Sequence, residues 1–370
     1  ISLPNDLAAC QQQIARCGLD VLYYPEPGMD PLTWMLSFSR LAPVQCAGIG
    51  HPVTGGISTV DYFLSDRDLE PENSGSQYTE QLVRLEGCPA WFTRPEIAPG
   101  ATRAQFGLPD GPLYVCPQEP FRFHPEFDAL LAAILADDPT GTLILFEGEQ
   151  RNWTRLLVQR LSASIPQFLQ RVKILPRMPS SHRLQVLQLA DVALDTLHSS
   201  DLLTAIRLVA AATPVVTWPG RFLRSRATAA VLERLGVTDT IAGSAEEYVR
   251  LATGLATSPQ WRNRISREIS EATPQLFEAP VSTASLERFL LAAVERSAQP
   301  PVPLADLLQL PAENQPTGNS PEVASTAQAA LPESADGAPS APVIPEPHFR
   351  LSAERASHHV AAEYAADEEF

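Results

Sequence analysis

One short segment combines the residue types that bind phosphate groups. Gln118 and Arg122 lie between an expected strand, which ends at Cys116, and a helix that should begin near Pro125. The amino end of a helix presents unpaired N–H groups, and a guanidinium can hold two phosphate oxygens at once. The sequence makes Arg122 a candidate diphosphate ligand, with an ordinary surface arginine as the equal alternative.

A second candidate anion site follows the strand expected at 192–194. The segment from Asp195 to Thr204 leads into a helix, and Ser199 or Ser200 could cap that helix and leave N–H groups for a phosphate. Asp201 opposes this arrangement, because a carboxylate in the first turn competes with a phosphate for the same positive end. The segment is as typical of a capped helix start as of an anion site.

Two further loops follow expected strands. In the first, Gly55 and Gly56 allow close approach of a ligand and Thr54 offers a hydroxyl group, but no GxGxxG pattern or P-loop lysine is present. A tight turn is the simpler interpretation, and His51 alone is more typical of a structural histidine. The second loop, 218–226, holds three arginines around a glycine, which suits interdomain salt bridges as well as ligand binding.

The elements that must position these loops alternate between strands and helices. Apolar runs of strand length are expected at 20–24, 45–49, 61–65, 113–116, 142–146, 172–175, 192–194 and 214–217. Helices are expected at 7–17, 126–136, 153–163, 182–190, 202–211, 224–235, 245–257 and 282–297. This alternation predicts parallel sheets with helices on both faces, in which ligands bind beyond the carboxyl ends of the strands.

The alternation restarts at a turn-rich stretch near residue 100. We therefore expect an α/β protein of two Rossmann-like, doubly wound lobes, at 1–100 and 101–280, with the first lobe truncated at its N-terminus. A helix at 281–297 should pack back on the lobes. Residues 298–370 hold eleven of the 35 prolines and a net charge of −9, so we expect a disordered acidic tail there.

Composition excludes several function classes. The 370-residue chain has a net charge of −16, which disfavours nucleic-acid and anionic membrane partners. No apolar run is long enough to span a membrane. The five cysteines show no metal-binding spacing, so reduced thiols in a cytoplasmic protein are expected. The chain begins Ile-Ser-Leu-Pro without a signal-like segment, which suggests a piece of a longer protein.

Six blocks of sequence, in register, resemble the catalytic region of the O-GlcNAc transferase family, the family 41 glycosyltransferases with their SPINDLY-like members. The resemblance spans about residues 5–295. The blocks are LAPVQ at 41–45 with GHPVTGG at 50–56, DYFLSD at 61–66, QYTEQLVRL at 77–85, FRFHP at 121–125, LADVALDT at 189–196 and TPVVTWPG at 213–220.

The resemblance implies a GT-B fold and the metal-independent transfer of a sugar, usually GlcNAc, from a UDP-sugar to Ser or Thr of a protein. It places Arg122 where the family has a donor-phosphate lysine and Gln118, or Glu119, where it has a glutamine. The remaining donor-side positions are His182, Arg183, Ser199, Ser200, Thr204 and Arg207. The acceptor-side loop comprises His51, Pro52, Thr54, Gly55 and Gly56. The family's catalytic base would lie upstream of this chain, as would its TPR repeats.

The donor loop departs from the family pattern. The family's glycine-rich loop with two threonines, which cradles the diphosphate, is here Ser200-Asp201-Leu202-Leu203-Thr204, so the pair of glycines is lost and only Thr204 keeps one of the threonine hydroxyls. Arg207 stands where the family has an acidic residue. Two hypotheses follow: a family 41-like transferase with no cofactor and no metal, or a degenerate GT-B module that binds a protein partner or an altered nucleotide.

Overall fold

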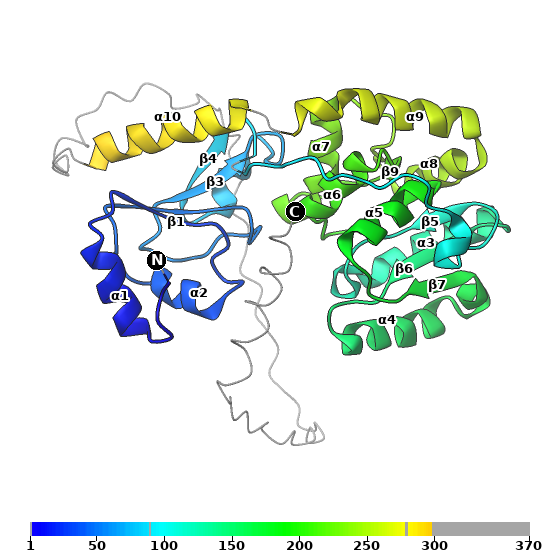
Figure 1. Ribbon diagram of the computed structural model, residues 1–370, viewed down its shortest axis with the longest axis horizontal. Coiled ribbons are helices and arrows are strands. Elements are labelled where there is room, and N and C mark those ends of the chain that lie inside the picture. Colours follow the sequence, from blue (N-terminus) through cyan, green and yellow to red (C-terminus); the bar gives the residue numbers. More distant parts are fainter. Residues whose placement is uncertain (1, 89, 278–279, 298–370) are drawn as a thin grey trace, which may run out of the picture. The chain divides into compact units, whose positions relative to one another are not determined.

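A computed structural model describes residues 2–88, 90–277 and 280–297 (Figure 1). These described residues belong to one compact unit. The tail predicted at 298–370 lies outside the described residues. Among those described, no helix has the length and apolar character needed to cross a membrane.

The first lobe is a parallel sheet in the order β1-β2-β3-β4. Its strands are β1 (Val21–Tyr24), β2 (Val44–Ala47), β3 (Tyr62–Asp66) and β4 (Gln81–Leu85). Two helices precede β2, α1 (Leu7–Arg16) and α2 (Pro31–Ser37), and an aspartate, Asp6 or Asp30, caps each one. The apolar patterning predicted neither β4, in which only Leu85 is buried, nor α2, which is only seven residues long.

The second lobe is a parallel sheet in the order β7-β6-β5-β8-β9. Its strands are β5 (Leu113–Val115), β6 (Thr142–Phe146), β7 (Val172–Leu175), β8 (Val192–Leu194) and β9 (Val215–Val216). The helices are α3 (Pro125–Asp137), α4 (Arg151–Ser164), α5 (Ser180–Leu189), α6 (Leu202–Ala210), α7 (Ala227–Leu235), α8 (Ala245–Thr257) and α9 (Pro259–Ala272). These helices bury the β5 and β8 side chains completely, as expected for a parallel sheet.

The last described helix, α10 (Pro280–Ser297), lies against the first sheet (Figure 1). Ala293 of this helix is buried with Val44, Cys46, Leu64 and Leu85 from β2, β3 and β4. The chain thus crosses to the second lobe after β4 and returns to the first at its last described helix.

The order of the second sheet determines which loops can meet. Because all five strands are parallel, their carboxyl ends share one edge, and β5, β8 and β9 are neighbours. The loops that follow them contain Arg122, Asp201 and the arginines of segment 218–226. The fold therefore brings three of the four candidate loops to the same edge.

Candidate functional site

The loops after β5 and β8 meet through Arg122. Arg122 ends a short 3₁₀ turn, Pro120–Arg122, just before α3. Its Nη1 donates to Ser199 Oγ at 3.0 Å, and its Nη2 donates to Asp201 Oδ1 at 3.4 Å. The Arg122 side chain is 20% exposed, so these contacts hold a partly exposed guanidinium at the carboxyl edge of the second sheet.

Asp201 is the N-cap of α6, which corrects the expectation that Ser199 or Ser200 would cap this helix. Its Oδ2 accepts from the backbone N–H and the Oγ1 hydroxyl of Thr204, both at 2.8 Å. A carboxylate is a strong N-cap because it accepts hydrogen bonds from the first turn and complements the helix dipole. Asp201 therefore occupies the amino end of α6, the position predicted for a phosphate.

The two serines before Asp201 have different surroundings. Ser199 is half-buried and faces Arg122. Ser200 is buried, and its hydroxyl pairs with Thr228 Oγ1 at 3.0 Å while accepting from the Thr228 N–H at 3.2 Å. Ser200 therefore joins α7 to the loop after β8, and its hydroxyl is already paired within the lobe.

A buried carboxylate, Asp195, lies directly beneath this loop. Gln118 Nε2 donates to Asp195 Oδ1 at 3.1 Å, and Thr217 Oγ1 donates to Oδ2 at 2.8 Å. Burial raises the pKa of Asp195 to about 6, although these hydrogen bonds oppose the shift. The predicted ligand Gln118 is thus held by Asp195, with its Oε1 atom buried and without a hydrogen-bond partner in the described structure. Sequence reasoning gave Asp195 no role, although its position after β8 could have suggested one.

Two further arginines, Arg183 and Arg207, lie beside the loop that holds Arg122. Arg183 of α5 donates to Pro117 O at 2.6 Å, stacks over the Phe146 ring and lies 3.8 Å from Glu119. Arg207 of α6 lines a narrow cavity together with Pro117, Ser180, Arg183, Leu184, Leu187 and Thr204. Burial lowers the pKa of Arg183, Glu119 counters the shift, and the charge of Arg207 adds to it.

Arg207 and His182, two of the predicted donor-side residues, have separate surroundings. Within the described ranges, no carboxylate forms an ion pair with the Arg207 guanidinium, so Arg207 does not pair with Asp201. His182 is exposed and places its ring edge-on to Phe106, with ring centroids 5.8 Å apart. The structure therefore brings Arg183 and Arg207 together, and His182 faces a different neighbour.

The acceptor-side loop is organised by Glu80, a residue that the sequence analysis gave no role. Glu80 is buried and accepts from the Gly55 N–H at 2.8 Å and from the Thr54 hydroxyl at 2.6 Å. Gly56 has a left-handed backbone, with φ of 65°, which favours glycine at this turn. His51 Nδ1 is buried without a partner among the described atoms, and Pro52 lies next to it, half-buried.

The arginine cluster after β9 forms no ion pair in the described part of the chain. Arg221 and Arg224 lie over the Phe222 ring, at 5.6 and 4.7 Å from its centroid. Arg226 donates to Leu69 O at 3.1 Å and thereby contacts the first lobe. The sequence suited this cluster to interdomain salt bridges or to ligand binding. The contact that Arg226 makes with the first lobe is a hydrogen bond to a backbone carbonyl.

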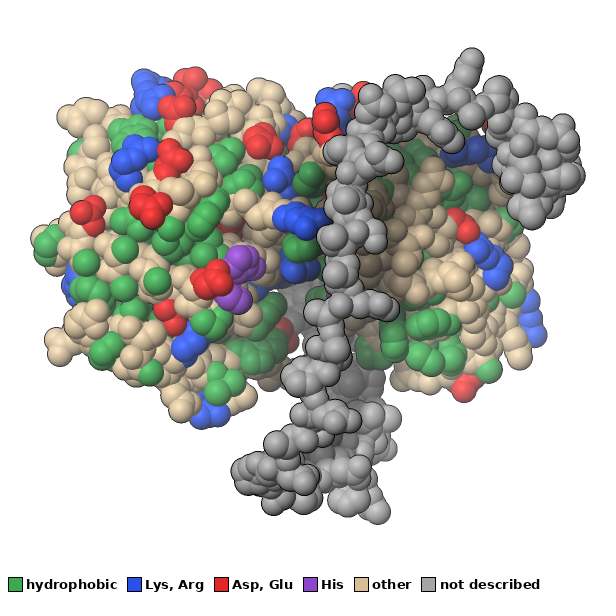
Figure 2. Space-filling view, turned by 180° about the vertical axis from the view of Figure 1, so that it is seen from behind, with side chains coloured by type: hydrophobic (Ala, Val, Ile, Leu, Met, Phe, Trp, Pro, Cys, Tyr) green, Lys and Arg blue, Asp and Glu red, His purple; other side chains and the backbone are tan. Residues whose placement is uncertain are grey.

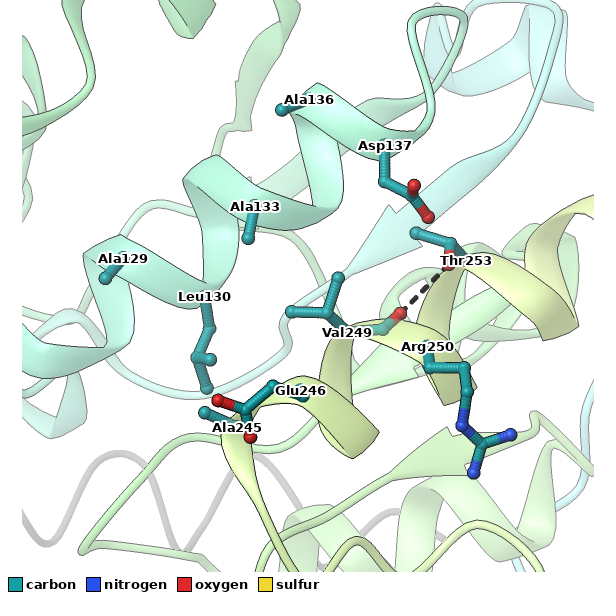
Figure 3. Close-up of a pocket in the computed structure, with 10 residues that line it drawn as sticks. All are labelled: Ala129, Leu130, Ala133, Ala136, Asp137, Ala245, Glu246, Val249, Arg250 and Thr253. Atoms are coloured by element: carbon teal, nitrogen blue, oxygen red, sulfur yellow. Dashed lines mark hydrogen bonds between the residues drawn. The ribbon is translucent and has the colours of Figure 1, made fainter.

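A separate groove of about 890 Å³ lies between α3 and α8 (Figure 3). Small or apolar side chains line most of it, and its polar members, Asp137, Glu246 and Arg250, lie around the rim without converging (Figure 3). The Thr253 hydroxyl donates to Val249 O within α8, at 3.0 Å. The groove is built by helix faces and lacks the strand-end loops, so it is a poor candidate for phosphate chemistry.

Two parallel α/β lobes with converging loops at the carboxyl edge of the second sheet define the chain as a protein of the GT-B fold. Among solved structures, a point mutant of the O-GlcNAc transferase from Thermobaculum terrenum is similar, with a TM-score of 0.68 and 25% identity. That alignment covers 80% of this chain and 58% of the other. A sucrose-phosphate synthase from Thermosynechococcus elongatus shares the fold at 17% identity, with a TM-score of 0.56 over 79% of this chain and 78% of the other.

The sequence model of glycosyl transferase family 41 matches residues 93–286, and the chain belongs to this family. Two Arabidopsis thaliana relatives are described as probable UDP-N-acetylglucosamine–peptide N-acetylglucosaminyltransferases. SPINDLY is 27% identical over 241 residues, and SEC is 27% identical over 266 residues. The alignments cover 59% and 67% of this chain but only 24% and 26% of the relatives. The family resemblance inferred from the sequence blocks is confirmed.

Proposed function

We propose that this chain is part of a glycosyltransferase that moves a sugar, GlcNAc or another hexose, from a UDP-sugar to Ser or Thr of a protein. Family membership supports glycosyl transfer, and the names of the SPINDLY and SEC relatives support a protein acceptor. The observations that carry the proposal are the contact of Arg122 with Asp201, the N-cap of α6, and the narrow cavity that Arg183 and Arg207 line together with Pro117 and Thr204. In a chain of net charge −16, three arginines on the loop after β5 and on the neighbouring helices α5 and α6 favour an anionic ligand.

The donor diphosphate would lie between Arg122 and the α6 amino end, with Arg183 and Arg207 adding positive charge. Catalysis in this proposal rests on positioning and on neutralising the charge that develops on the leaving UDP. Arg122 supplies this neutralisation, so the transfer needs no metal and no organic cofactor. To bind diphosphate, Arg122 must exchange its contact with Asp201 for phosphate oxygens.

The acceptor would enter at the loop that holds Thr54, Gly55 and Gly56. The backbone N–H of Gly55 and the hydroxyl of Thr54 are both taken up by Glu80. We therefore infer that this loop shapes the wall of the acceptor site and that the Thr54 hydroxyl and the Gly55 N–H do not donate hydrogen bonds to the acceptor. The predicted upstream TPR repeats and the cytoplasmic setting stay predictions.

One observation favours a second candidate function. The Asp201 carboxylate occupies the helix end and is paired with Arg122, so the site satisfies its own charges without a ligand. Such a site is typical of a degenerate lobe that keeps the GT-B fold and binds a protein partner instead of a UDP-sugar.

Calorimetric titration of UDP and UDP-GlcNAc into the chain distinguishes the two functions. For a transferase we expect micromolar binding that Arg122→Ala weakens by at least about 30-fold, because a charge-assisted contact to phosphate is removed. Arg155→Ala is the matched control, since Arg155 is a surface arginine of the same lobe that donates to Asn152. Absence of binding at millimolar UDP would favour the degenerate lobe.

A further inference from the structure

Two histidines and a glutamate from separate segments meet on the surface of the second lobe. His124 and Glu126 stand at the start of α3, and His198 belongs to the loop after β8, 72 residues beyond Glu126. One ring nitrogen of each histidine and a carboxylate oxygen of Glu126 all lie within 4.8 Å of one another. Figure 2 shows two adjacent histidine side chains beside an acidic side chain on one face of the molecule.

The detailed geometry is near that of a metal-binding triad. His198 Nε2 lies 2.8 Å from Glu126 Oε2, and His124 Nδ1 lies 4.0 Å from the same oxygen. Ligand atoms around a tetrahedral zinc ion are about 3.4 Å apart, given zinc–ligand bonds of about 2.0–2.1 Å. All three side chains are exposed, so small rotations suffice to bring the nitrogens and the oxygen to that spacing.

The backbone holds both histidines in place. His124 is the N-cap of α3, and its Nδ1 accepts from the Glu126 N–H at 3.3 Å, a hydrogen bond that the Nδ1 lone pair gives up when it binds an ion. His198 has a left-handed backbone, with φ of 66°, which is uncommon for a residue other than glycine. This conformation directs the imidazole toward Glu126 and His124, whose ring centroid lies 4.6 Å from that of His198.

We propose that His124, Glu126 and His198 form a binding site for a divalent transition-metal ion, with zinc as the ion the ligand set favours. Two imidazoles and one carboxylate, with solvent open at the fourth position, suit zinc, whereas magnesium and calcium prefer oxygen ligands only. With neutral imidazoles the three ligands carry a net charge of −1, which a divalent cation offsets.

The bound ion would join the loop after β8 to the amino end of α3. That loop also carries Ser199 and Asp201, which both contact Arg122. The ion would therefore hold the loop that presents Asp201, while standing outside the sugar-transfer step. The site depends on its three ligands alone, so it can exist whether or not the lobe binds UDP.

Zinc titration tests this site directly. The full chain, without a purification tag and stripped with a chelator, is titrated with zinc chloride by calorimetry at pH 7.5. We expect one equivalent to bind with a micromolar Kd. Cobalt in place of zinc should give an absorption spectrum without a thiolate charge-transfer band, which excludes the cysteines as ligands.

Conservative variants separate ligand loss from misfolding. His198→Asn keeps a residue that tolerates the left-handed backbone, and His124→Ser keeps a good N-cap, but neither supplies an imidazole. Each is expected to weaken zinc binding at least tenfold. His182→Ala is the control in the same lobe and should bind zinc as the wild type does. Replacement of His358 and His359, which lie outside the described residues, should also leave binding unchanged.

The outcome is decisive either way. Absence of saturable one-to-one binding in the wild type would overturn the site, as would binding unaffected by His198→Asn and His124→Ser or lost with the His358 and His359 replacement. None of these readouts involves UDP, so failure of the zinc site is distinguishable from failure of the proposed transferase function.

Discussion

The guanidinium of Arg122 and the carboxylate of Asp201 lie in contact, with 3.4 Å between Nη2 and Oδ1. The other oxygen of Asp201 accepts from both the N–H and the hydroxyl of Thr204. Asp201 thus takes the two partners, a guanidinium and a helix amino end, that the proposal assigns to the donor diphosphate. Any diphosphate that binds here must compete with a carboxylate that is already well satisfied.

Asp201→Asn should therefore strengthen UDP binding. Asparagine is as good an N-cap as aspartate, so α6 keeps its first turn while the negative charge is lost. Removing a charge a few ångströms from a phosphate is expected to raise the affinity for UDP by about tenfold or more, since such a pair repels by one to several kcal/mol near a protein surface. Calorimetry on the variant and the wild type measures the change.

Asp239→Asn is the matched control for this experiment. Asp239 is an exposed partner of Arg264 in the same lobe, and its replacement should leave the affinity for UDP unchanged. An Asp201→Asn variant that binds UDP no better than the wild type would mean that the carboxylate is not the obstacle to binding.

Asp195 should make the stability of the protein fall as the pH rises. Its pKa is raised to about 6 by burial, above the unfolded value of about 3.9, so the folded state holds its proton longer than the unfolded state. Stability contributed by this group is fully present below about pH 4 and is lost between about pH 4 and 6. Two pKa units correspond to roughly 2–3 kcal/mol.

Urea denaturation of the wild type and of Asp195→Asn, from pH 4 to 8, isolates this effect. The free energy of unfolding of the wild type minus that of the variant should fall by about 2–3 kcal/mol between pH 4 and 6 and then stay level. For Asp239→Asn, the free energy of unfolding of the wild type minus that of the variant should not fall by about 2–3 kcal/mol between pH 4 and 6. A flat difference for Asp195→Asn would show that Asp195 titrates alike in the folded and unfolded states.

Apolar patterning predicted most of the fold because the sheets are parallel and buried on both faces. Strands such as Thr142–Phe146 are continuous apolar runs, which stand out in the sequence. The patterning did not predict the edge strand Gln81–Leu85, in which only Leu85 is buried, or the helix Pro259–Ala272, in which only Ile265 and Ile269 are buried. Elements with little buried surface leave a weak apolar signal.

The candidate site was predicted at the level of loops but not of side-chain partners. Strand order brings the loops after β5 and β8 together, and the parallel sheet indicates which ends meet. Sequence reasoning assigned the cap of α6 to Ser199 or Ser200, whereas Asp201 caps it. It also gave no sign that Gln118 bonds Asp195, 77 residues away. Such pairings depend on three-dimensional packing, which local propensity does not encode.

Glu80→Gln should destabilise the loop that holds Gly55. Both carboxylate oxygens of Glu80 accept hydrogen bonds, from the Gly55 N–H at 2.8 Å and from the Thr54 hydroxyl at 2.6 Å. A glutamine side chain has a single acceptor oxygen, so either the Gly55 N–H or the hydroxyls of Thr54 and Thr79 lose their acceptor, at a cost of about 1–3 kcal/mol. Hydrogen exchange should show faster exchange at Gly55, and urea denaturation should show the lower free energy of unfolding.

Glu86→Gln serves as the control for Glu80→Gln, because Glu86 is exposed and contacts Arg67 at 3.4 Å. It should leave both measurements near the wild type. Equal protection of Gly55 in the Glu80→Gln variant would contradict the role assigned to the Glu80 carboxylate.

Arg234→Met should lower stability most at neutral pH. Arg234 on α7 donates to Asp66 at 2.8 Å and to Asp68 at 2.9 Å, and Asp66 is buried with its pKa already raised by burial. Without Arg234 the Asp66 carboxylate is a buried charge with little compensation, which costs about 3–5 kcal/mol. The loss should shrink as the pH falls, because protonation of Asp66 removes the uncompensated charge.

Restoring a neutral partner tests that explanation of the Arg234→Met effect. The double variant Arg234→Met with Asp66→Asn has no buried charge at residue 66, so it should recover part of the lost free energy of unfolding at pH 7. Arg250→Ala, which removes an exposed arginine paired with Glu247 on α8, should change stability little. If the double variant is no more stable than Arg234→Met at pH 7, removing the buried charge has not raised the free energy of unfolding. The loss in Arg234→Met would then come from packing around the arginine stem.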